Sequence, residues 1–137
     1  MGRLALLVSR GAHNNLAQVA SVIMAAVVSD MSVRVLFRDE AVLSLSKSRI
    51  GSLPLSEGYR TIEADYRRRL KEARMHDITA LFREAKEDGD VKLYVCTSSL
   101  FLAGVTSSDL IPELDEPRGL VSFLIEEMEG ADQVLSF

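Results

Sequence analysis

The stretch LALLVSRGAHNNLAQVASVIMAAVVSDMSVRVLF, residues 4–37, decides the fold class. It opens on Leu4 to Val8, a continuous apolar run without alternation, which is typical of a central parallel strand covered on both faces. The apolar positions between Leu16 and Val28 then recur at helical spacing, and Val33 to Phe37 has the pattern of a second strand. Strand, helix and strand in this order predict a right-handed βαβ unit.

The chain after residue 37 continues this alternation. Thr61 to Asp88 reads as a helix with a break near Asp77, which is suited to start the second part as its N-cap. The β-branched and aromatic run Val91 to Cys96 predicts a third strand, which leads directly into the helix-start signature Thr97-Ser98-Ser99. Further features are also expected: a helix cap at Asn14 or Asn15, a helical turn at Ala41–Leu45, a loop at Ser46–Arg60, an edge strand at Leu110–Leu114, a helix at Glu116–Glu129 and a final strand at Asp132–Phe137.

These elements predict an α/β protein with a single domain over residues 1–137. Strands that alternate with helices form a three-layer α/β/α sandwich around a mainly parallel sheet, here of four to five strands. A chain of 137 residues can bury a core without help from disulfides or a structural metal.

Composition and charge narrow the classes of partner. Hydrophobic residues make up 47% and charged residues 26% of the chain, which is typical of a globular protein and not of a disordered one. The formal net charge of −4 gives no support to nucleic acid or an anionic membrane as a partner. The longest apolar stretch, Leu16 to Val28, is interrupted by Gln18 and Ser21 and is too short to cross a bilayer. We therefore expect a cytoplasmic protein.

The chain has one cysteine, Cys96, which excludes an intrachain disulfide and a cysteine-rich metal cage. His13, His76 and Cys96 do not have the spacing of metal ligands. The turn after the first strand lacks both the G-x-G-x-x-G and the Walker pattern. We therefore expect neither a metal nor a cofactor.

The carboxyl ends of the predicted strands are where ligands bind in open parallel sheets. Cys96 ends the third strand where a helix begins, and the first amides of that helix favour an anion. Such a setting lowers a thiol pKa from about 8.5 into the range of roughly 3.5–7.5. Arg10 and Arg38 follow the first and second strands and can add positive potential or hold an oxyanion.

Two readings of Cys96 stay open at this point. Free cysteine is often buried as a small inert hydrophobe, whereas its place at a strand end favours a reactive thiolate. Spacing excludes three thiolate chemistries, because Leu102 replaces the arginine of a phosphatase loop, Ser99 the second cysteine of a dithiol motif, and Leu93 the threonine of a peroxidatic site. A Cys-His-Asn hydrolase with His13 or His76 is formally possible, but neither histidine has a recognisable context. What remains is a thiolate that carries a group without a partner thiol in its own chain.

The segment VKLYVCTSSL, residues 91–100, resembles the DsrE/DsrF-like sulfur-relay proteins, in particular their peroxiredoxin-like branch. Gly104, Asp109-Leu110-Ile111 and the ending ADQVLSF, residues 131–137, belong to the same resemblance. It implies a five-stranded parallel sheet and a homo-oligomer, a trimer or a hexamer. It also implies a persulfide or thiosulfonate on one cysteine, whose position Cys96 matches. The turn Ser9 to His13 departs from the acidic, proline-containing turn of the family.

The resemblance and the strand ends together lead to one expected function. It is a cytoplasmic sulfur carrier, a sulfurtransferase-type protein that takes sulfur from a donor on Cys96 and passes it to an acceptor protein. The residues expected to bind the anion or substrate are Thr97, Ser98, Ser99, Arg10 and Arg38. The alternative is a non-catalytic oligomeric interaction or regulatory module with an inert cysteine. A third reading is a small enzyme that binds a nucleotide or an acidic metabolite at the same strand ends.

Overall fold

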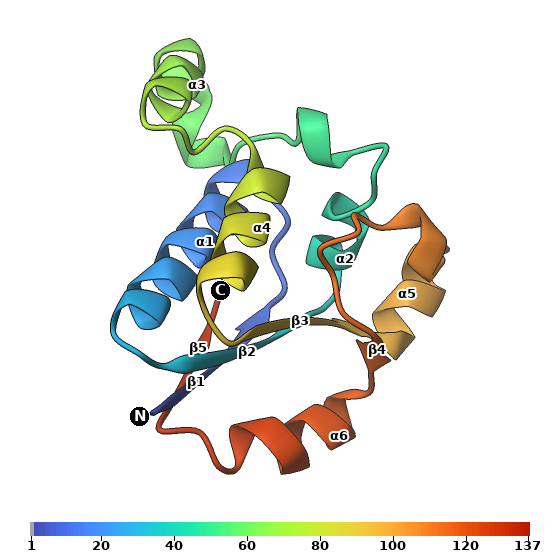
Figure 1. The fold of residues 1–137 in the computed structure, drawn as a ribbon. Coiled ribbons are helices and arrows are strands. Elements are labelled where there is room, and N and C mark those ends of the chain that lie inside the picture. The colour runs from blue at the N-terminus through green and yellow to red at the C-terminus, as the bar shows by residue number, and fades with distance from the viewer. Residues whose placement is uncertain (1) are drawn as a thin grey trace.

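The computed structural model describes residues 2–137 and contains one five-stranded parallel sheet with the order β4-β3-β2-β1-β5 (Figure 1). Its strands are β1 (Arg3–Val8), β2 (Ser32–Phe37), β3 (Val91–Cys96), β4 (Pro117–Arg118) and β5 (Gln133–Ser136). All neighbouring strands pair in parallel. The prediction of an α/β sandwich around a mainly parallel sheet is therefore confirmed.

The helices form two layers and a group at the carboxyl ends of the strands. Helices α1 (His13–Val28) and α4 (Ile78–Asp88) lie together over one face of the sheet (Figure 1). The opposite face is covered by α6 (Leu120–Phe123), which continues into a π-helical turn over Leu124–Met128. Helices α2 (Glu40–Ser44) and α5 (Thr97–Ala103) follow directly on the ends of β2 and β3, and α3 (Glu63–Glu72) projects from the body.

The two faces of the sheet bury very different amounts of apolar surface. Side chains alternate along each strand, so Leu93 and Val95 of β3 face α1 and α4, while Tyr94 and Cys96 face α6. The cluster under α1 and α4 is large and includes Leu6, Leu16, Ile23, Val35, Phe37 and Phe82. The cluster under α6 consists of Ala5, Leu36, Tyr94, Cys96 and Phe123, with Leu7, Leu120, Met128 and Ala131 at its edge. The lone cysteine therefore lies under the thinner layer.

Three of the expected local features are wrong. Helix α1 begins at His13 with Ala12 as its N-cap, because the Asn14 and Asn15 side chains bond to Ser56 and to the Arg10 carbonyl instead. Residues Leu110–Leu114 form no strand: Leu110 makes an isolated bridge with Ser46. The edge strand is β4, where Pro117, which has no N–H, occupies a position that tolerates its absence. As a consequence the helix expected over Glu116–Glu129 begins only at Leu120.

The helix breaks and stops follow the sequence more closely. The carboxylate of Asp77 accepts a hydrogen bond from the Ala80 amide at 3.1 Å and caps α4, as its position after the break predicts. Gly104 ends α5 with a φ of +69°, a left-handed conformation that glycine adopts without strain. Within residues 2–137 no helix has the length and apolar character needed to span a bilayer.

Candidate functional site

Cys96 stands at the junction of two elements, since it is the last residue of β3 and the N-cap of α5. On one side the sheet register pairs it with Arg118 of β4. On the other side β2 and β3 pair as far as Phe37 and Val95, so Arg38, the next residue of the chain, continues beside Cys96. The ends of β4 and β2 thus each place an arginine at the backbone position beside Cys96.

Polar groups from the first turn of α5 surround the thiol. The Ser98 hydroxyl lies 3.3 Å from the Cys96 Sγ. Burial acts to raise the pKa of the Cys96 thiol, but hydrogen bonding from Ser98, from the amide and hydroxyl of Ser99 and from Arg38 outweighs it and lowers the pKa to about 7. At neutral pH the thiolate is therefore more populated than in a cysteine with the ordinary pKa of about 8.5.

Arg38 contributes a second sign of an anion site. Its Nε atom is buried and has no hydrogen-bond partner among the described residues. An unsatisfied buried donor costs about 1–3 kcal/mol, so an anion that accepts this N–H recovers part of that cost. The next residue, Asp39, has a φ of +49°, a strained conformation for a residue with a Cβ, and its amide donates to the Ser99 hydroxyl at 2.9 Å. The Arg38 turn is thus tied to the start of α5.

The sulfur itself is covered. Cys96 is 1% exposed and packs in the small cluster with Leu36, Tyr94 and Phe123. Thr97 and Ser98, which follow it, are exposed, whereas Ser99 is buried. A reagent that approaches from solvent therefore meets Thr97 and Ser98 before it meets Sγ.

Of the residues expected at the site, the structure brings Ser98, Ser99 and Arg38 to the thiol, and Thr97 adjoins it in the chain. Arg10 is not among the groups that bond to Cys96; it lines a separate cavity beside α1. Strand parity offers a signal for this separation. Along β1, Leu6 and Val8 face α1, and Arg10, two positions after Val8, continues this alternation on the same side. Arg38, two positions after Leu36, continues the alternation of β2 on the Cys96 side.

A charged network next to the site has no counterpart in the sequence expectations. Arg118 lies over the Tyr94 ring, with its guanidinium carbon 4.7 Å from the ring centroid. Glu127, in the π-helical turn, is buried and its carboxylate contacts three guanidinium groups, of Arg118 at 3.2 Å, of Arg3 at 3.4 Å and of Arg34 at 3.5 Å.

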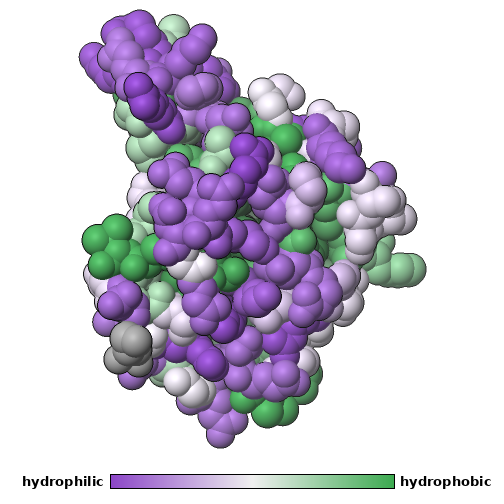
Figure 2. Space-filling model, in the orientation of Figure 1, coloured by the Kyte–Doolittle hydropathy of each residue, from purple (hydrophilic) through white to green (hydrophobic). Residues whose placement is uncertain are grey.

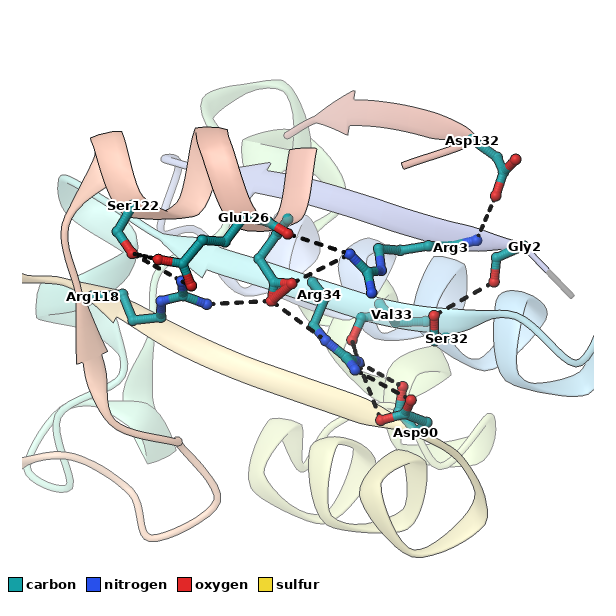
Figure 3. Close-up of polar contacts among 11 residues, drawn as sticks. Gly2, Arg3, Ser32, Val33, Arg34, Asp90, Arg118, Ser122, Glu126 and Asp132 are labelled. Atoms are coloured by element: carbon teal, nitrogen blue, oxygen red, sulfur yellow. Dashed lines mark hydrogen bonds and ion pairs between the residues drawn. The ribbon is translucent and has the colours of Figure 1, made fainter. Parts of the chain in front are cut away.

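The arginines of this network come from three strands and all face the helix above them (Figure 3). Arg118 also bonds to Ser122 and Glu126, and Arg34 to Asp90 at the opposite end of the sheet. The one sequence signal for the network is Arg34, a charged residue inside an otherwise apolar strand. Ion pairs therefore add to the apolar contacts of Phe123, Leu120 and Met128 in attaching this helical segment to its face of the sheet.

No group of three or more His, Cys, Asp or Glu side chains that could hold a metal ion occurs within residues 2–137. The arrangement at Cys96 can instead stabilise negative charge on sulfur or on an oxyanion beside it, through Ser98, Ser99 and Arg38.

Comparison with known proteins assigns the chain to a protein family. A search of curated proteins gives no match. A solved structure of a protein of unknown function from Methanobacterium thermoautotrophicum is similar in fold, with a TM-score of 0.63 and 13% identity, over 98% of this chain and 99% of that chain. The model of the DsrE/DsrF-like family matches residues 2–137. With that match over almost its whole length, the chain belongs to the DsrE/DsrF-like family.

Proposed function

We propose that the protein is a cytoplasmic sulfur carrier that holds a persulfide, or a thiosulfonate, on Cys96. Membership of the DsrE/DsrF-like family suggests a sulfur-relay role. The observation that carries the assignment to Cys96 is the convergence of donors on its sulfur, which lowers the thiol pKa to about 7.

The loading step is a thiol exchange. The Cys96 thiolate attacks the outer sulfur of a donor persulfide R–S–SH, a new S–S bond forms to Sγ, and the donor's own S–S bond breaks. The thiolate R–S⁻ leaves with the electron pair, and the proton stays on the transferred sulfur. Hydrogen bonds from Ser98 and Ser99 to Sγ stabilise the attacking sulfur as an anion before this step.

The unloading step reverses the roles. A thiolate on the acceptor protein attacks the outer sulfur of the Cys96 persulfide, takes it with its proton, and leaves Cys96 as a thiolate. A leaving thiol with a pKa near 7 departs more readily than one near 8.5. The hydrogen bonds from Ser98 and Ser99 that stabilise the attacking thiolate therefore also make Cys96 a good leaving group.

Arg38 gives the site a preference among donors. Its buried and unpartnered Nε atom suits a donor that carries an oxyanion, such as thiosulfate, whose oxygens accept N–H hydrogen bonds. Since Cys96 is 1% exposed, loading needs a local opening, and Phe123 of α6 is the side chain of the covering layer that shares its cluster.

We propose that the carrier works as a homo-oligomer. Large apolar side chains remain exposed on α6, its π-helical turn and the edge strand β5: Val121, Leu124, Ile125, Val134 and Leu135. Figure 2 shows hydrophobic side chains at the surface over α6, at the bottom of the view. An apolar helix face beside an open strand edge fits a second copy of the chain better than it fits water.

The burial of Cys96 favours a second candidate, a non-catalytic oligomeric module in which the thiol is inert. A sulfur that is 1% exposed inside an apolar cluster is the usual state of a structural cysteine. In this case the family fold is kept for its interaction surfaces alone.

One experiment separates the two functions. The native protein is incubated with glutathione persulfide or with thiosulfate, and the intact mass is recorded. The carrier gains one sulfur atom, either the outer sulfur of the persulfide with glutathione thiolate leaving or the outer sulfur of thiosulfate with sulfite leaving, while Cys96→Ser gains nothing. Equal gain by both proteins, or gain by neither, contradicts the carrier and supports the module.

A further inference from the structure

The end of β1 lies at the point where the chain reverses its direction across the sheet. From β1 the chain proceeds to β2 on one side, while β5 is added on the other side. The amides of Ser9 and Arg10 both approach the Phe137 carbonyl, at 2.8 and 3.5 Å, so the ends of β1 and β5 are joined. In open α/β sheets, ligands bind outside the carboxyl ends of the strands at such a switch point.

A cavity of about 350 Å³ opens at this place, beside the start of α1. Its polar lining side chains are Arg10, Asn14, Asn15, Gln18, Ser56, Tyr59 and Tyr66. No Asp or Glu belongs to the lining within the described part of the chain. The volume lies at the small end of the range of ligand sites, roughly 300–1,000 Å³, and suits a metabolite-sized molecule.

The walls of the cavity are fixed by hydrogen bonds within the chain. The side-chain amide of Asn15 donates a hydrogen bond to the Arg10 carbonyl at 2.9 Å and holds the turn after β1. Asn14 and Ser56 bond to each other twice, at 3.0 and 2.8 Å, and thereby tie the opposite wall to α1. The rings of Tyr59 and Tyr66 pack with their centroids 4.2 Å apart. The cavity therefore exists before any ligand arrives, which lowers the entropic cost of binding.

The charge of the cavity favours an anion. Arg10 has no ion pair with any residue in 2–137, and the first turn of α1 carries no acidic side chain to offset the positive end of the helix dipole. Burial, followed by the hydrogen bond with Tyr59, raises the pKa of Tyr66, so that its phenol remains a neutral hydrogen-bonding group. A cation finds no counter-charge in this lining.

The cavity is separate from the thiol site. It borders α1, whereas the Cys96 side chain faces α6 on the opposite side of the sheet. Strand β2 also lies between β1 and β3, which sets the two strand ends about 10 Å apart.

We propose that this cavity is a second binding site, for a small polar organic anion. Arg10 meets the anionic group, a carboxylate or a phosphate, and Asn14, Gln18 and Ser56 bond to the hydroxyl or amine groups of the body. This site does not depend on sulfur chemistry, so Cys96→Ser binds the same ligand with the same affinity.

The test uses isothermal titration calorimetry at fixed ionic strength with three probes: malate, AMP and inorganic phosphate. We expect malate or AMP to bind at one site, and the one that binds identifies the anionic group. Arg10→Gln should raise the Kd about tenfold or more, because it removes a charge-assisted hydrogen bond. Lys92→Gln, an exposed residue of β3 that loses the same charge, is the matched control and should leave the Kd unchanged.

NMR of the wild-type protein gives a second readout that needs no variant. Binding should shift the side-chain amide signals of Asn14 and Gln18 and leave the Cys96 region unmoved. The proposal is overturned if neither malate nor AMP binds with a Kd below about 10 mM, a weak affinity for any specific site. It is also overturned if Arg10→Gln binds as wild type does, if the shifts lie elsewhere, or if inorganic phosphate binds as tightly as the organic anions.

Discussion

The two faces of the sheet are covered by helices through different kinds of contact. Under α1 and α4 the strands present an almost unbroken apolar surface, and long helices close over it. Under α6 a small apolar cluster shares the face with Arg3, Arg34 and Arg118, and a buried carboxylate joins these arginines to the short helix above (Figure 3). The first face concentrates the hydrophobic driving force for folding. The second leaves the polar groups and the lone thiol under a thin cover that is attached both by apolar contacts and by ion pairs.

The largest expected effect is on the apolar face. Phe82→Ala removes a fully buried ring from the large cluster and should lower the free energy of unfolding by about 3–5 kcal/mol. Phe123→Ala makes the same truncation on the α6 face and should cost less, about 3 kcal/mol or below, because the smaller cluster collapses more easily onto the gap. Urea unfolding of both variants measures the difference.

Phe123→Ala should also uncover the thiol. We expect the native variant to react with a thiol reagent about tenfold faster than wild type, or more, since Phe123 shares the cluster of Cys96. Phe82→Ala serves as the control for lost stability. If it accelerates the reaction equally in native buffer, global unfolding and not the α6 cover controls access.

The charged attachment of α6 gives the next effect. Glu127→Gln leaves Arg34 and Arg118 without their buried carboxylate and should cost about 2–3 kcal/mol in unfolding free energy. Glu126→Gln changes an exposed carboxylate on the same turn and should cost less than about 1 kcal/mol. Equal losses for the two variants in urea unfolding would show that the buried network contributes nothing beyond surface charge.

The smallest expected effect is on the thiol itself. Arg38→Gln removes one of the groups that favour the anion, so the pKa of Cys96 should rise from about 7 toward its ordinary value. The reaction rate at pH 7 should then fall several-fold, while Arg49→Gln, which lies away from the thiol, should leave it unchanged. An unaltered pH profile in Arg38→Gln would remove Arg38 from the site.

Much of the fold could be predicted from local pattern, and the failures have specific physical causes. The apolar run at Leu4–Val8 and the break before Asp77 report local chemistry, and both predictions agree with the structure. The sequence pattern predicts the edge strand at Leu110–Leu114, but two proline-containing segments compete for the edge. Tertiary pairing with Val95 and Cys96 selects Pro117–Arg118.

The part of the site that depends on neighbours in the chain could also be predicted from the sequence. The position of Cys96 before a helix follows from its neighbours in the chain, and so does the arrangement of Ser98 and Ser99. The contacts of Glu127 depend on where a nine-residue helical segment settles over three strands, which no local pattern specifies.

The pH dependence of Cys96 alkylation in the native protein probes the reactive thiolate without any assumption about donor or acceptor. Iodoacetamide is added at a series of pH values, and the same series in urea gives the reference for the unfolded chain. The folded protein should lose reactivity as the pH falls through about 7, whereas the unfolded chain should lose it near its ordinary pKa of about 8.5. A native protein that reacts only after unfolding, or with the same midpoint as the unfolded chain, contradicts a carrier thiolate at Cys96.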